Sequence, residues 1–134
     1  MKVEKYTFGV GDRFAHQGHA QLQAILQARG ADIDVYPVWN KSNREHLMIR
    51  SKPDDVRAEA DAAVAALGWE GTYYVDADHI GLKTVDAFIE ASDFYTVDVA
   101  DCTGQAADPA RSRALLKKRI DTLDPTLFRG LIDP

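Results

Sequence analysis

The sequence predicts an α/β protein built from parallel β/α repeats, and two observations lead to this prediction. Strand-like and helix-like segments alternate along the 134 residues, as consecutive parallel strands with helical crossovers require. Neither of the phosphate-binding glycine patterns GxGxxG and GxxxxGK[ST] of open sheets occurs. We therefore expect residues 1–134 to be a single domain, the N-terminal (β/α)4-like part of a TIM-type (β/α)8 barrel. A small open α/β sheet is the alternative.

Each element follows from its local residue pattern. Strands are expected where β-branched and aromatic residues gather between turn signals, at residues 6–10, 33–39, 72–75 and 94–99. Helices are expected where apolar residues recur at helical spacing, at residues 16–29, 52–67, 83–91 and 109–123. Gly30 and Gly68 end two of these helices, and Pro53 lies in the first turn of one. The polar, irregular stretch 41–51 is expected to be a loop of functional length.

Composition excludes several classes of protein. The net charge of −5 and the pI of about 5.3 argue against general binding to nucleic acid or to anionic lipid. Cys102 is the only cysteine, so an intrachain disulfide is excluded, and so is a zinc site that needs two or four cysteines. The sequence has neither a signal-like apolar start nor a stretch near the roughly 20 apolar residues that a membrane helix needs. We expect a cytoplasmic protein without nucleic-acid or membrane partners.

Polar side chains cluster where each predicted strand ends. They are Asp12, Arg13 and His16 after the first strand, Trp39, Asn40 and Lys41 at the second, Asp76, Asp78 and His79 at the third, and Asp98 and Asp101 at the fourth. In a β/α barrel all these positions fall on one rim, which is where catalytic residues lie. The sequence therefore predicts a site on that rim.

The pair Asp78-His79 is the sharpest candidate. A neutral imidazole is a common ligand for Zn²⁺ and related ions, and an adjacent carboxylate can move a proton. Asp76 alternates with Asp78 along the strand, so both are expected on one face as part of a cation site. The alternatives are a helix cap for Asp78, a surface position for His79, and for Asp76 a buried ion pair with a base such as Lys41.

Other side chains are candidates for binding the carboxylate or the hydroxyl groups of a substrate, or for supporting Asp76 and Asp78. The candidate substrate-binding residues are Arg13, Asn40, Lys41, Arg44 and Asp98. The alternative for Arg13 is a salt bridge to Asp12 or Asp34, and the loop residues have the alternative of a solvated surface. His16 and His19 share a helix face by their i, i+3 spacing, which permits joint metal binding but is typical of exposed helix residues.

Four segments of the chain resemble the tagaturonate epimerase family. They are FGVGDRF with HQG at residues 8–18, PVWNKS with REH at residues 37–46, VDADHI at residues 75–80 and DFYTVDVAD at residues 93–101. The resemblance implies an isomerase that uses a divalent metal ion, of the Zn, Ni or Mn type, to interconvert tagaturonate and fructuronate. More distantly, residues 74–98 are similar to class II aldolase barrels. That similarity implies that Asp78 is the acid–base group and His79 a metal ligand.

Members of that family are several times longer than this chain, and no histidine follows His79. The expected function is a metal-dependent epimerase of hexuronate catabolism that works by retro-aldol/aldol chemistry. The alternatives are a truncated non-catalytic fragment or binding module, and a class II aldolase or isomerase acting on a related sugar acid. Because part of a barrel exposes two sheet edges, we also expect a homo-oligomer.

Overall fold

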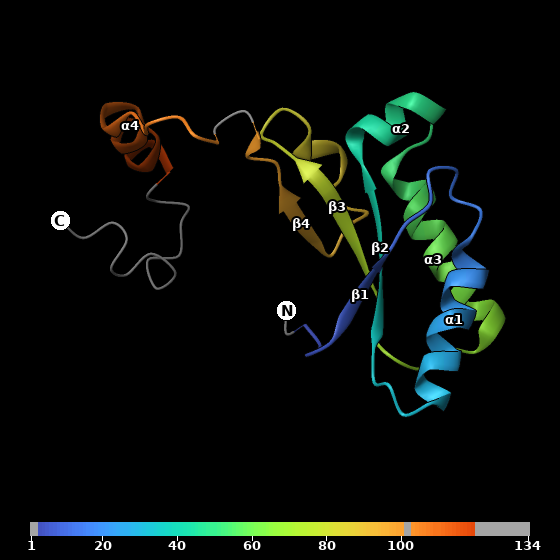
Figure 1. Ribbon diagram of the computed structural model, residues 1–134. Helices are drawn as coiled ribbons and strands as arrows, with labels where there is room; N and C mark the ends of the chain where they lie inside the picture. The colour runs from blue at the N-terminus through green and yellow to red at the C-terminus, as the bar shows by residue number, and fades with distance from the viewer. Residues whose placement is uncertain (1–2, 101–102, 120–134) are drawn as a thin grey trace. The chain divides into compact units, whose positions relative to one another are not determined.

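The computed structural model describes residues 3–100 and 103–119, and the chain divides into two compact units, Met1–Asp101 and Cys102–Pro134. The first unit contains a parallel sheet in the order β1-β2-β3-β4 (Figure 1). Its strands are β1 (Thr7–Val10), β2 (Tyr36–Ser42), β3 (Tyr74–Ile80) and β4 (Phe94–Val97). The predicted α/β class is confirmed. That residues 1–134 are one domain of a larger barrel stays a prediction.

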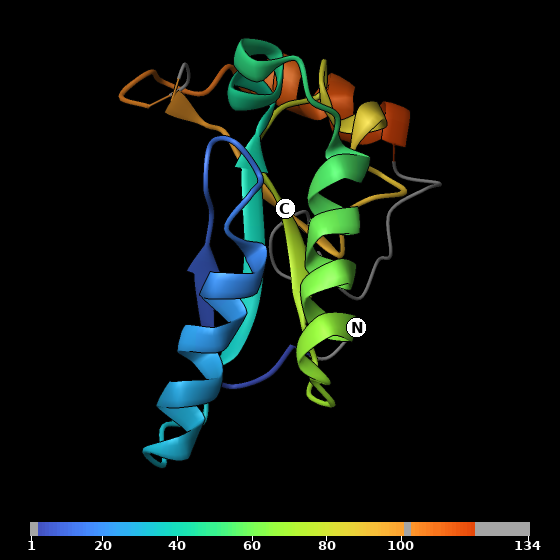
Figure 2. The same ribbon diagram turned by 90° about the vertical axis from the view of Figure 1, so that its right-hand side faces the viewer.

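The helices of the first unit are α1 (Gly18–Gly30), α2 (Asn43–Ile49), α3 (Pro53–Leu67) and the short 3-10 helix η1 (Val85–Ala87). Figure 2 shows α1 and α3 side by side along one face of the sheet. The second unit contains α4 (Pro109–Arg119), and residues 120–134, where the predicted last helix continues, lie outside the described residues. Sequential strand order with both long helices on one face differs from a doubly wound sheet and is consistent with part of a (β/α) barrel.

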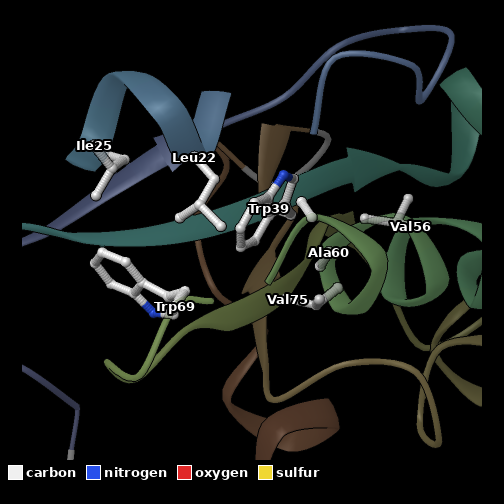
Figure 3. Packing of buried hydrophobic residues seen from close by; sticks show 8 residues of the cluster. Leu22, Ile25, Trp39, Val56, Ala60, Trp69 and Val75 are labelled. Carbon is white, nitrogen blue, oxygen red and sulfur yellow. The ribbon is translucent and has the colours of Figure 1, made fainter. Parts of the chain in front are cut away.

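The main hydrophobic core lies between the sheet and these two helices (Figure 3). Its buried members are Leu22, Ile25, Trp39, Val56, Ala60, Ala63, Trp69 and Val75. They repeat at three- and four-residue spacing on the helices, and on the strands they occupy the face toward the helices. The Trp39 indole donates a hydrogen bond to the Gln21 side chain over 3.1 Å, so the largest buried ring keeps its N–H satisfied. The helices predicted at residues 16–29 and 52–67 are confirmed, and their ends lie within two residues of the prediction.

The two central strands end later than predicted. The ladder pairs Asn40 with Asp76 and Ser42 with Asp78, beyond the predicted strand ends at residues 39 and 75. Polar side chains interrupt the hydrophobic pattern there, but they do not interrupt the backbone hydrogen bonds on which a strand depends. Asp76, Asp78 and His79 therefore lie within β3 rather than after it.

The loop predicted at residues 41–51 is wrong, because most of it is helix α2. Ser42 begins this helix with a capping box: its hydroxyl accepts from the Glu45 backbone, and the Glu45 carboxylate accepts from the Ser42 N–H and hydroxyl. Arg50 ends the helix in the left-handed conformation, with φ of 58°. The pattern Ser-x-x-Glu is readable in the sequence and was the signal for this helix.

The helix predicted at residues 83–91 is also wrong, because only Val85–Ala87 are helical and the turn is of the 3-10 type. Residues three apart lie on one side of a 3-10 turn, which brings Val85 and Phe88 together against a small core cluster of Ala77 and Ile80. Ile89, which a helix over residues 83–91 would place on the same face as Val85, is 50% exposed. Packing of Phe88 thus takes precedence over helix propensity in this crossover.

His46 is a buried histidine of α2 that contacts the chain after α2 and the crossover after β3. Its Nδ1 lies 2.8 Å from the Ser51 hydroxyl, and its ring packs at 5.6 Å, centroid to centroid, from Phe88. Burial lowers the pKa of His46 below the ordinary value of 6.5. The charge of Lys41 lowers this pKa further, while Asp55 and Glu45 raise it by less. The folded state therefore favours the neutral form of His46.

This depressed pKa predicts a loss of stability in mild acid. Below pH 6.5 the unfolded chain binds a proton at His46 that the folded chain does not, so the free energy of unfolding falls as pH decreases toward the folded-state pKa. The slope is at most about 1.4 kcal/mol per pH unit for one proton. Urea unfolding between pH 5 and 8 measures it, and His46→Gln, which cannot titrate, should remove this part of the slope. Equal slopes for both proteins would contradict the prediction.

Candidate functional site

A pocket of about 660 Å³ is lined by residues at the carboxyl ends of β2, β3 and β4 and by residues of α2. Figure 1 shows where these strand ends and α2 lie in the fold. The lining residues are Ser42, Asn43, Arg44, Glu45, Asp78, His79, Gly81, Leu82, Lys83, Thr84 and Asp98. Four of these, Arg44, Asp78, His79 and Asp98, were predicted from the sequence as rim residues or binding residues. They meet because the carboxyl ends of parallel strands share one edge of the sheet.

Asp78 and His79 form a hydrogen-bonded pair on the wall of this pocket. Asp78 Oδ1 and His79 Nδ1 are 2.7 Å apart, and the side chains are 24% and 62% exposed. The hydrogen bond and the negative charge of Asp78 raise the pKa of His79 above its ordinary value. Because a carboxylate accepts, Nδ1 carries the hydrogen, which leaves Nε2 as the ring nitrogen available to a ligand. Asp78 Oδ2 has no hydrogen-bond partner in the part of the chain that the structure describes.

A break in the strand register presents this pair to the pocket. The β3–β4 ladder shifts between Ala77 and Ile80, and His79 lies in the left-handed region with φ of 54°. The extra residue returns Ile80 to the core and leaves His79 turned outward. This conformation costs a non-glycine residue about 1–2 kcal/mol. Bulges and such backbone strain are over-represented at active sites, so this geometry favours a functional role for the pair.

Asp76 lies two residues before Asp78 in β3 and is 7% exposed. Its Oδ2 accepts a hydrogen bond of 2.7 Å from the Thr96 hydroxyl, whereas the buried Oδ1 has no partner among the described residues. Burial raises the pKa of this carboxyl group above its ordinary value. The alternative ion pair with Lys41 is not formed, because the Lys41 ammonium donates to the Arg13 carbonyl oxygen over 2.8 Å. Asp76 does not line the pocket.

A divalent ion in a protein commonly needs three or more donor side chains grouped in space. Among residues 3–100 and 103–119, no three His, Cys, Asp or Glu side chains are grouped so that they could hold a metal ion. A metal-binding histidine commonly donates its second N–H to a carboxylate, and Asp78 and His79 have that arrangement. The described residues therefore fit one protein ligand, Nε2 of His79, and do not complete a site.

Two of the predicted substrate-binding residues, Lys41 and Asn40, lie away from the pocket. Lys41 is buried on β2, and its ammonium group bonds to the backbone of the β1–α1 loop. The Asn40 side chain lies against Gly11, where an added Cβ would overlap it. The missing side chain of this glycine thus makes room for Asn40 beside the end of β1.

The β1–α1 loop is ordered by Asp12 rather than by a salt bridge to Arg13. The Asp12 carboxylate accepts backbone hydrogen bonds from Phe14 at 2.8 Å, His16 at 2.8 Å and Gln17 at 3.0 Å. Burial alone would raise the pKa of Asp12, but these donors outweigh burial and lower it. Asp34, the other proposed partner, pairs instead with Arg29 over 3.3 Å. Arg13 is exposed in this loop and does not line the pocket.

The sequence prediction missed two charged residues of the pocket, Glu45 and Lys83. The capping box was the signal for Glu45, since its partner Ser42 ends β2. No comparable pattern marked Lys83, which follows β3 in a turn of mixed composition. Asp101, also named as a rim residue, is outside the described residues.

The chain is an α/β protein with a parallel sheet in sequential strand order and a pocket at the carboxyl ends of the strands. Enzymes built as (β/α) barrels have their active sites at this end of the strands. Residues 1–129 match the family model UxaE, described as tagaturonate epimerase. The chain belongs to the tagaturonate epimerase family, a family of isomerases, which confirms the resemblance seen in the sequence. No match was found among curated proteins.

Two solved structures are similar in fold. Both are glycerol complexes of the fructuronate-tagaturonate epimerase UxaE from Cohnella laeviribosi, at 24% and 23% sequence identity with TM-scores of 0.60 and 0.56. Each alignment covers 91% of this chain but 24% of that enzyme, so the chain spans about a quarter of its length. None of the described helices is both long and apolar enough to cross a membrane.

Proposed function

We propose that this chain supplies the N-terminal β/α units, and the pocket at their carboxyl ends, of a metal-dependent epimerase that interconverts tagaturonate and fructuronate. The observation that supports the proposal most is the Asp78–His79 pair, which lines the pocket at a strained bulge in a chain of this family. Full closure into a (β/α)8 barrel, with the remaining strands beyond this chain, is part of the proposal.

The two sugar acids differ at a hydroxyl-bearing carbon β to the ketone, whose hydrogen the carbonyl does not acidify. We propose a retro-aldol/aldol route for that reason. The hydroxyl proton leaves, and the bond between this carbon and the carbon α to the ketone breaks. Its electron pair passes into the carbonyl, giving an aldehyde and an enediolate. The aldehyde rotates, the bond forms again on its other face, and the proton returns.

We assign the roles of Asp78 and His79 in this route from the geometry of the pair that they form. Oδ2 of Asp78, which no described residue engages, takes the hydroxyl proton and returns it. Oδ1 holds the ring of His79 so that Nε2 faces away from Asp78, where it would serve as a metal ligand. When bound, a divalent ion of the Zn, Ni or Mn type would supply positive charge near the substrate oxygens.

The proposal is tested by incubating the protein with tagaturonate, with and without chelator, and following the formation of fructuronate by NMR. We expect interconversion that chelator abolishes and added metal restores, with full retention of deuterium placed on the epimeric carbon. Release of that label to solvent would exclude the retro-aldol route. The 134-residue chain and a longer protein that contains it are compared side by side.

A second candidate is a non-catalytic fragment or binding module. It is favoured by the 24% coverage of the related enzyme and because, among the described residues, no three His, Cys, Asp or Glu side chains are grouped to hold a metal ion. If the longer protein does not interconvert the two sugar acids in the presence of metal, the epimerase proposal is wrong and the non-catalytic module is supported.

A further inference from the structure

Each carboxylate of the pocket has one oxygen that is engaged within the chain. Glu45 Oε2 accepts from the N–H and the hydroxyl of Ser42, both over 3.0 Å. Asp78 Oδ1 is 2.7 Å from the His79 ring, and Asp98 Oδ1 accepts from the Ala100 N–H over 3.0 Å. Each acid of the pocket wall therefore has an oxygen bound to a neighbouring group.

The two cations of the pocket, Arg44 and Lys83, differ from its acids in their contacts. Arg44 and Lys83 both line it and are exposed. Among the described residues, no carboxylate forms an ion pair within 4.0 Å of either side chain. Two cations without a carboxylate partner among the described residues can bind an anion through charge-assisted hydrogen bonds.

Hydrogen bonds between Gly81 and Thr84 hold the turn that carries Lys83. Thr84 closes the turn after β3, because its N–H and its hydroxyl both donate to the Gly81 carbonyl, over 3.0 and 3.1 Å. The Gly81 N–H donates to the Thr84 hydroxyl over 3.2 Å in return. Lys83 is thus held at the pocket by the turn after β3, whereas Arg44 comes from the first turn of α2, after β2.

We propose that Lys83 is a specificity-determining residue that binds, together with Arg44, the carboxylate of the sugar acid. This inference rests on the proposed function, since it names the part of that substrate which the two cations recognise. The sequence predicted this carboxylate-binding role for Lys41. Lys41 is buried and bonded to the backbone, so we assign the role to Lys83. The substrate carboxylate then lies beside Lys83 and Arg44, and the reacting hydroxyl group of the substrate is left to Asp78.

The test compares two ligands that differ in the carboxylate. Tagatose has a hydroxymethyl group where tagaturonate has its carboxylate, so the ratio of the two dissociation constants measures recognition of the acid. The ratio is determined by NMR titration of the 134-residue chain, for the natural protein and for Lys83→Gln. The natural protein should prefer tagaturonate, and Lys83→Gln should lose about tenfold or more of that preference, as expected for a hydrogen bond to a charged group.

Two variants serve as controls. Lys83→Arg keeps the charge and should keep most of the preference. Lys5→Gln removes a lysine before β1, at the amino end of the sheet, and should leave the preference unchanged. If Lys83→Gln binds tagaturonate with unchanged preference, the inference is wrong and the proposed function stands. If the natural protein and its longer form bind neither sugar, the proposed function fails and the inference fails with it.

Discussion

On the proposed function, we expect replacement of Asp78 by Asn to lower the rate of tagaturonate–fructuronate interconversion by about 10²- to 10⁴-fold, the usual contribution of a general acid–base group. The amide has the shape of the carboxylate, and its oxygen can still accept from the His79 ring across the 2.7 Å contact. It cannot accept and return the hydroxyl proton. The loss should therefore appear in kcat, with little change in KM.

The measurement is a steady-state assay of the protein that contains these residues, with added metal. Asp86→Asn is the matched control, because Asp86 is an exposed carboxylate of η1 that does not line the pocket. That variant should keep the natural rate. An Asp78→Asn enzyme within a factor of about two of the natural rate would remove Asp78 from the mechanism.

Replacing Asp93 by Ala destabilises the fold by about 2–4 kcal/mol, the largest effect on stability that we expect from the polar contacts of the chain. Asp93 Oδ2 accepts from the Arg57 guanidinium over 2.6 Å and from the Val75 N–H over 2.7 Å. Arg57 also donates to the Ala91 carbonyl over 3.0 Å. Alanine leaves a buried N–H of β3 and a partly buried cation without their acceptor.

Urea unfolding at pH 7 measures this loss. Asp93→Asn keeps an acceptor for the Val75 N–H and should lose less than Asp93→Ala. Asp34→Ala breaks the ion pair with Arg29, which is more exposed: the Arg29 side chain is 36% exposed and the Asp34 side chain 66%. This substitution should lower the free energy of unfolding by less than about 1 kcal/mol. Equal losses for Asp93→Ala and Asp34→Ala would contradict the role of Asp93 as a link between α3, β3 and the start of β4.

The family and the fold class were predictable because their signals are local. The alternation of strands and helices predicts a parallel sheet, and the segments around Gly9, Trp39, Asp78 and Asp98 carry the family pattern. The capping box at Ser42 could have predicted α2 for the same reason, since its two partners are three residues apart. The meeting of Arg44, Asp78 and Asp98 then follows from the shared edge of a parallel sheet.

The remaining features depend on contacts between segments far apart in sequence. Lys41 is buried because the ladder continues past Trp39, so the side that Lys41 takes depends on pairing with β3. Packing of Phe88 against Ala77 and Ile80 decides the course of the chain after β3. Neither fact can be read from residues 41 or 88 by themselves.

The pair Asp78-His79 has features of both kinds, some predictable from local sequence and some set by contacts between distant segments. The sequence by itself determined that a carboxylate and an imidazole lie at the carboxyl end of the third strand, because strand period and order place them there. Only the tertiary structure decided that a bulge turns His79 outward, that Asp78 holds its Nδ1, and that Lys83 lines the same pocket. The physical reason is that strand order follows from local patterns, whereas register, burial and side-chain direction are set by the neighbouring strand and the helices packed against it.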